Sequence, residues 1–73
     1  MYHREYPITP TQEATNGALS LFVEGCRMDD LGQQLFGLSI LRSATEAQVQ
    51  AAMPSVQASQ QVTLSEIEAM FAR

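Results

Sequence analysis

The 73-residue sequence contains no lysine and no tryptophan, and it has a single cysteine and a single histidine. One cysteine cannot form a disulfide within the chain. Together with the lack of a signal peptide, it predicts a protein of the reducing cytoplasm. Histidine, cysteine and carboxylate side chains do not follow any spacing typical of a metal site. We therefore expect no metal and no cofactor, and a fold that depends on packing alone.

Basic residues are also scarce, because four arginines face eight aspartates and glutamates and leave a net charge of −4. Proteins that bind nucleic acid gain most of their affinity by neutralising phosphates with basic side chains. The composition therefore predicts no direct, sequence-specific contact with nucleic acid, and it disfavours an anionic membrane surface. The apolar runs are far shorter than the ~20 residues that span a bilayer.

Apolar residues make up 45% of the chain, and many recur at the i, i+3, i+4, i+7 spacing of an amphipathic helix. This pattern predicts an all-α fold, a small bundle of three or four short helices with an extended N-terminal arm. The length fits a single domain. The predicted segments of the domain 1–73 are an arm over 1–8, a helical core over 9–53, a polar linker over 54–62 and a C-terminal helix over 63–73.

The first helix is predicted to begin at Thr9 as N-cap, with Pro10 in the first helical position. Gly25 is typical of the residue that follows a helix, which predicts an end near Glu24. The predicted buried stripe consists of Leu19, Phe22, Val23 and Cys26.

The stretch 30–41, capped by Asp30, carries large apolar side chains on two sides of a helical wheel and is predicted to be the centre of the fold. One side consists of Leu31, Leu35 and Leu38. Phe36 and Ile40 lie on the other side, and we expect the first and last helices to cover them. If they are left uncovered, they form a patch for a partner or a second copy.

Two further capping boxes predict two further helices. Ser43 and Glu46 would open a helix that Pro54 ends, since proline disfavours helical backbone in the residue before it. Thr63 and Glu66 would open the last helix.

Candidate catalytic groups are few. His3 lies near the N-terminus, where a solvent-exposed terminal residue is the simpler interpretation. Cys26 continues an apolar stripe, which favours a small buried thiol over a nucleophile. We therefore predict no catalytic residues and a protein that is not an enzyme.

The N-terminal arm offers the best candidates for binding a partner. Tyrosine and arginine are enriched in binding hot spots, and in an extended chain alternate residues lie on the same side. The alternative is a frayed terminus or a strap that covers the helical core, and this alternative stays open. The predicted partner-binding residues are Tyr2, His3, Arg4 and Tyr6.

With this arm and an acidic helical body, the chain resembles small phage-encoded regulators that bind host RNA polymerase, the transcription inhibitors and antiterminators of Xanthomonas phages. The resemblance covers the whole chain, including its size, the arm 2–6 and the end at Phe71, Ala72 and Arg73. It implies a non-enzymatic protein of the host cytoplasm that docks on the polymerase β′ subunit, inhibits transcription initiation and promotes antitermination.

A structural or chaperone-like assembly subunit of a phage or secretion apparatus is the alternative function. The sequence does not decide between a monomer and a homo-oligomer.

Overall fold

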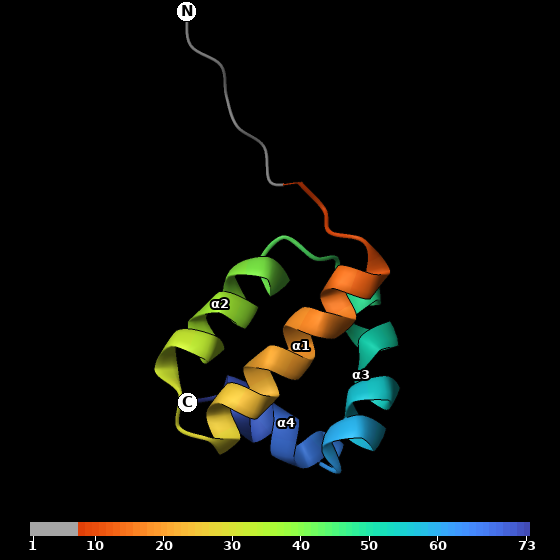
Figure 1. The fold of residues 1–73 in the computed structure, drawn as a ribbon. Coiled ribbons are helices and arrows are strands. Elements are labelled where there is room, and N and C mark those ends of the chain that lie inside the picture. Colours follow the sequence, from red (N-terminus) through yellow and green to blue (C-terminus); the bar gives the residue numbers. More distant parts are fainter. Residues whose placement is uncertain (1–7) are drawn as a thin grey trace, which may run out of the picture.

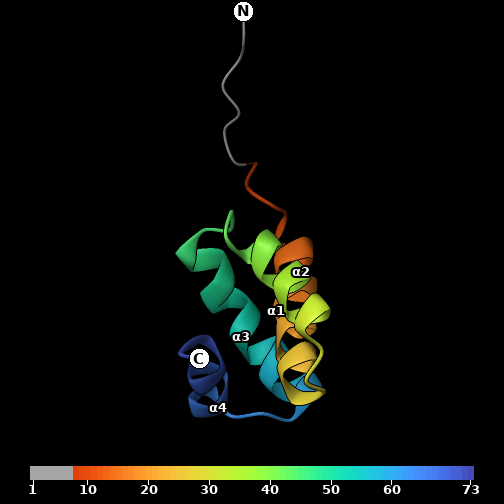
Figure 2. The same cartoon turned by 90° about the vertical axis from the view of Figure 1, so that its left-hand side faces the viewer.

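The computed structural model describes residues 8–73, and this part of the chain forms four α-helices and no strand. Figure 1 shows α1 between α2 and α3, with α2 antiparallel to α1. In the view of Figure 2, α4 lies beside the end of α3 at the bottom of the molecule. The predicted all-α bundle is confirmed. The helices are α1 (Gln12–Arg27), α2 (Leu31–Leu41), α3 (Glu46–Gln60) and α4 (Leu64–Phe71).

The predicted arm falls almost wholly outside this description, because residues 1–7 are not among the described residues. Of the predicted arm only Ile8 is described, and its side chain is exposed. In the described part of the chain, none of the helices has the length and apolar content needed to cross a membrane.

The centre of the fold is α1, so the prediction that the stretch 30–41 is central was wrong. α1 contacts each of the other three helices. Its predicted stripe is buried throughout, and the fully buried Thr15 beside it donates its hydroxyl to the Thr11 carbonyl at 3.0 Å. The buried core consists of Ala18, Leu19, Phe22, Val23, Cys26, Leu41, Ala52, Val56, Val62 and Ile67.

Both predicted ends of the first helix were wrong. The N-cap is Thr11, whose hydroxyl accepts the Ala14 N–H at 3.0 Å, so the helix starts after the Thr9–Pro10 pair. At the other end the helix continues through Gly25 to Arg27. Gly25 is buried inside the helix, where its small size admits α2.

The polar linker predicted over 54–62 is also corrected, because α3 runs without a break through Pro54 to Gln60. A proline inside a helix removes one hydrogen bond, here to the Gln50 carbonyl, and crowds the preceding turn. Ala52 and Val56 flank it and are fully buried. Their burial in the core outweighs the local penalty, and Pro54 itself is exposed.

Two of the predicted caps are confirmed. The Asp30 carboxylate accepts the Gln33 N–H at 3.0 Å at the start of α2. At the start of α4, the Thr63 hydroxyl accepts the Glu66 N–H at 3.1 Å, and the Glu66 carboxylate accepts the Thr63 N–H at 2.7 Å. Each interaction satisfies backbone groups that a helix end leaves unpaired.

The capping box of α3 was predicted two residues too early, because its N-cap is Thr45 and not Ser43. Gln48 completes the box and also donates to the Pro10 carbonyl at 2.7 Å. Gln12 in turn donates to the Gln48 carbonyl at 2.8 Å. These bonds join the first turns of α1 and α3, a long-range role that local sequence rules do not detect.

Candidate interaction surface

The most exposed apolar surface of the helical bundle is the side of α2 that points away from α1. We call it the outer face of α2. Leu31, Leu35 and Phe36 are 65%, 55% and 59% exposed, and positions four apart on a helix are neighbours. Contiguous exposed apolar residues of this kind mark interaction sites in soluble proteins. The outer face consists of Leu31, Gly32, Leu35, Phe36 and Ser39.

These large side chains point outward because α2 packs against α1 through glycines. A Cβ atom on Gly37 would lie 2.6 Å from the Ala18 carbonyl oxygen and 2.8 Å from the Phe22 amide nitrogen. A Cβ atom on Gly25 would lie 2.7 Å from the Gln34 amide nitrogen. The two backbones therefore approach each other directly, and there is no room between them for the leucines.

Two glutamines fix the rotation of α2 about its own axis. Gln33 donates to the Glu24 carboxylate of α1 at 2.8 Å, and Gln34 donates to the Gly25 carbonyl at 3.3 Å. Both bonds lie toward the α1 side of the helix. Together with the glycine contacts they hold the apolar side chains in solvent.

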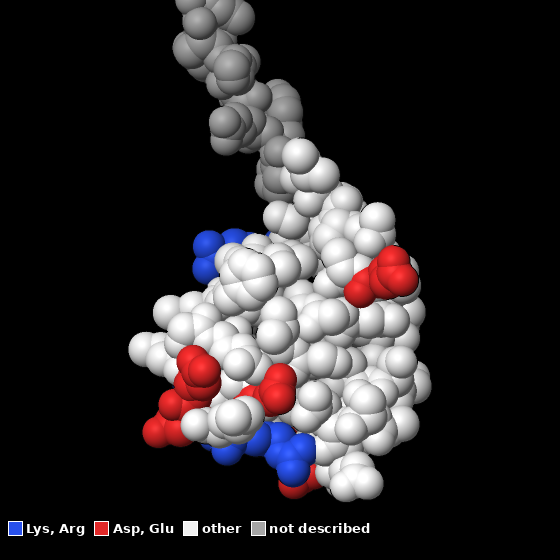
Figure 3. Space-filling view, in the orientation of Figure 1, with Lys and Arg blue, Asp and Glu red and all other residues white. Residues whose placement is uncertain are grey.

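The outer face carries no charge, and its two ends carry opposite charges. No residue of α2 is ionisable, whereas Asp29 and Asp30 precede the helix and Arg42 follows it. Figure 3 shows uncharged surface along α2, with basic atoms near its upper end and acidic atoms near its lower end, where further basic atoms lie beside them at the bottom of the molecule. This order also complements the helix macrodipole, since anions are favoured at the N-terminus and cations at the C-terminus.

A shallow groove of about 280 Å³ lies between α2 and α4, lined by Leu38, Leu41, Arg42 and Phe71. Phe71 reaches it from α4 and stacks on Phe22, with ring centroids 4.4 Å apart. Leu38 lies almost one turn beyond Leu35, so the groove borders the outer face of α2 and extends its apolar area.

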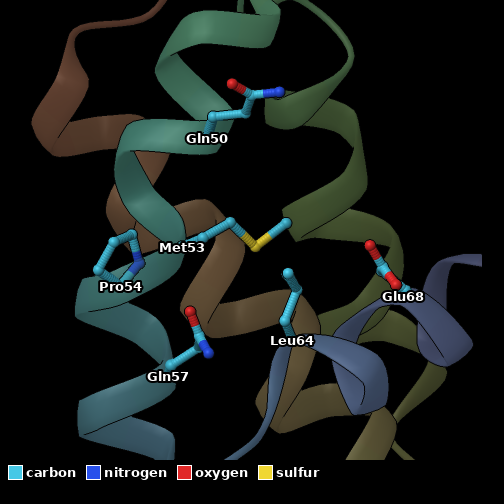
Figure 4. Close-up of a pocket in the computed structure, with 6 residues that line it drawn as sticks. All are labelled: Gln50, Met53, Pro54, Gln57, Leu64 and Glu68. Atoms are coloured by element: carbon cyan, nitrogen blue, oxygen red, sulfur yellow. The ribbon is translucent and has the colours of Figure 1, made fainter.

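A second groove of about 310 Å³ lies between α3 and α4. Figure 4 shows Met53 and Leu64 extending into it from opposite helices. The volume is at the lower end of the ~300–1,000 Å³ typical of small-molecule sites. Glu68 is the only ionisable lining residue, so the groove suits an apolar group better than a reaction. Its lining consists of Gln50, Met53, Pro54, Gln57, Leu64 and Glu68.

The one thiol lies in the core, as predicted. Cys26 is 5% exposed, and burial raises its pKa, with a smaller opposing effect from the positive charge of Arg73. Since the thiolate is the reactive form, a raised pKa disfavours nucleophilic chemistry. Across residues 8–73, His, Cys, Asp and Glu side chains do not gather in any group of three that could hold a metal ion.

The predicted partner-binding residues are not part of this surface. They lie outside the described residues and stay a prediction: Tyr2, His3, Arg4 and Tyr6. The expectation that the first and last helices cover Phe36 and Ile40 was wrong for Phe36, which is exposed, whereas Ile40 is half-buried against the core.

Leu31 and Leu35 belong to the surface and were missed, because they were expected to face the core. The signal that could have found them is Gly37. A glycine flanked by large residues in a helix indicates the side on which another helix approaches, so the opposite side is the exposed one.

The sequence matches no model of a known protein family, and comparison with curated proteins and with solved structures finds nothing similar.

Proposed function

We propose that this protein acts by binding other protein chains and not by catalysis. The observation that carries the proposal is the outer face of α2, an uncharged surface with three large apolar side chains mostly in solvent. Removing such groups from water on binding contributes roughly 25 cal/mol per Å² of apolar area. The glycine contacts that keep these side chains outside suggest that the exposure is built into the fold.

Within this proposal, the preferred partner is bacterial RNA polymerase, with the β′ subunit favoured, and the preferred site of action is the cytoplasm of a host cell. The support is the resemblance of the arm and the acidic body to phage-encoded regulators. Binding would inhibit transcription initiation and promote antitermination. The arm would supply the hot-spot residues, with two tyrosine rings and a guanidinium group. These residues are Tyr2, His3, Arg4 and Tyr6.

Titration calorimetry with purified bacterial RNA polymerase tests this function. The full chain should bind, and deletion of residues 1–6 should weaken binding at least tenfold, because truncation of hot-spot residues costs ~2 kcal/mol or more. Circular dichroism should show that the deletion keeps its helices. The regulator hypothesis fails if the full chain has no affinity for polymerase, or if the deletion binds as tightly as the full chain.

An assembly subunit of a phage or secretion apparatus is the second candidate. The observation that favours it is again the apolar outer face of α2, since permanent interfaces are more apolar than transient ones. Transcription with purified polymerase separates the two functions. A regulator should change promoter initiation or terminator read-through, whereas an assembly subunit should change neither.

A further inference from the structure

We propose that the outer face of α2 binds a second copy of this chain, with the two α2 helices antiparallel about a two-fold axis that crosses between Leu35 and Phe36. This inference rests on the proposed role of α2 as a protein-binding surface, and it names the first partner of that surface. The argument depends on the order of residues along the helix, on charge and on size.

The two smallest residues of the outer face, Gly32 and Ser39, lie at equal distances along the helix from this axis. The axis places Gly32 of each copy opposite Ser39 of the other, while Leu35 and Phe36 each lie beside their own counterparts. Gly32 has no side chain, and Ser39 already donates its hydroxyl to the Phe36 carbonyl of its own helix at 2.7 Å. Two helices can thus approach closely at both points without burying an unsatisfied hydroxyl. A closed two-fold dimer needs a self-complementary surface of this kind.

Charge selects the antiparallel direction. Asp29 and Asp30 lie at one end of α2 and Arg42 lies at the other, all three exposed. An antiparallel pair brings each arginine to the acidic end of the second copy, whereas a parallel pair would place like charges together. Opposite helix dipoles favour the same arrangement. The middle of the face offers no charge to an acidic or a basic partner.

Size sets the strength of the association. α2 has 11 residues and is therefore about 16 Å long at 1.5 Å per residue. An interface built on one such helix and the bordering groove belongs to the small class of less than ~1,200 Å². We expect a weak, reversible dimer, because interfaces of this size are typical of transient association.

Sedimentation equilibrium on the full chain tests the dimer. The apparent mass should rise with concentration from 8.0 kDa toward twice that value. Leu35→Glu and Leu35→Arg should each raise the dissociation constant at least tenfold, because the axis sets two like charges side by side. An equal mixture of the two variants should dimerise again, since each glutamate then meets an arginine. An interface that does not place Leu35 beside its own counterpart would not give this rescue.

Leu64→Glu is the matched control. Leu64 is a leucine of similar exposure, 44%, on α4, so its replacement should leave the dimer intact. Leu35→Cys is a second variant that introduces no charge. It should form an intermolecular disulfide under mild oxidation, while Leu64→Cys should not, and the native Cys26 is buried.

The proposal is overturned if the full chain stays at 8.0 kDa at millimolar concentration, if Leu35→Glu dimerises like the parent, or if the mixture stays monomeric. Polymerase binding is measured separately on the same samples. If the chain dimerises but does not bind polymerase, the proposed regulator is refuted and this interface stands. If the chain is monomeric and binds polymerase, this interface is refuted and the proposed regulator stands.

Discussion

At the scale of single residues, glycine has opposite consequences at two positions of this molecule. Gly37 permits the contact between α2 and α1, since an added Cβ atom would lie 2.6 Å from a backbone oxygen. Gly17 is exposed within α1, and an added Cβ atom would meet nothing within 4 Å. Glycine is therefore required at position 37, whereas at position 17 it only lowers the stability of the helix.

Gly17→Ala should stabilise the protein by about 1 kcal/mol, because alanine loses less backbone freedom than glycine on entering a helix. For a domain of this size, that corresponds to a melting temperature roughly 4–8 °C higher. Thermal unfolding followed by circular dichroism measures it. An unchanged or lower melting temperature would mean that the side of α1 at Gly17 is covered in solution.

Gly37→Ala should destabilise the protein by about 1–3 kcal/mol, since overpacking forces backbone shifts that outweigh the better helix propensity of alanine. Gly32→Ala is the control on the same helix, because the nearest atom to its Cβ would be an Asp30 carboxylate oxygen at 3.5 Å. Denaturant melts at low protein concentration should separate the two variants. Equal stability of both would contradict the close backbone contact.

At the scale of elements, short capping signals located some helix starts well. Asp30 and Thr63 were identified correctly as the caps of α2 and α4. The starts predicted at Thr9 and Ser43 were each two residues early. The true caps are Thr11 for α1 and Thr45 for α3. The sequence offers both candidates, and only packing against the neighbouring helix decides between them.

The cap of α4 should make stability depend on pH. Hydrogen bonds from the Thr63 backbone and side chain lower the pKa of Glu66 below its ordinary value. A carboxyl group with a lowered folded pKa contributes stability that is fully present above its unfolded pKa of about 4.3, and this stability is lost as pH falls through the folded pKa. The melting temperature should therefore drop as pH is lowered from about 6 to about 3.

Glu66→Gln should reduce that drop, because a glutamine side chain can still accept the Thr63 N–H and does not titrate. Glu68→Gln removes the same charge from the same helix without touching the cap, so it should retain the drop of the parent protein. If the melting curves of Glu66→Gln and the parent fall equally with pH, the carboxylate does not cap α4 in solution.

At the scale of the whole molecule, the fold class and the core of α1 could be predicted, but the arrangement of the helices could not. Apolar periodicity finds the face of a helix that can be buried, and it found the buried face of α1. In α2 the same rule failed, because the helix packs against α1 through a close backbone contact at Gly37, which leaves its large side chains on the opposite, exposed side. The candidate surface was therefore predicted only at Phe36 and only as a conditional patch.

The single thiol allows the opening of the core to be measured by chemical modification. Cys26 is buried, and its pKa responds to Arg73, the residue just beyond α4. A modifying reagent can reach the sulfur only when the covering structure opens, so the rate of thiol modification reports the frequency of opening. α4 is the shortest helix, with eight residues, and its Phe71 stacks on Phe22, one turn before Cys26. No label needs to be engineered to measure how often the core around Cys26 opens.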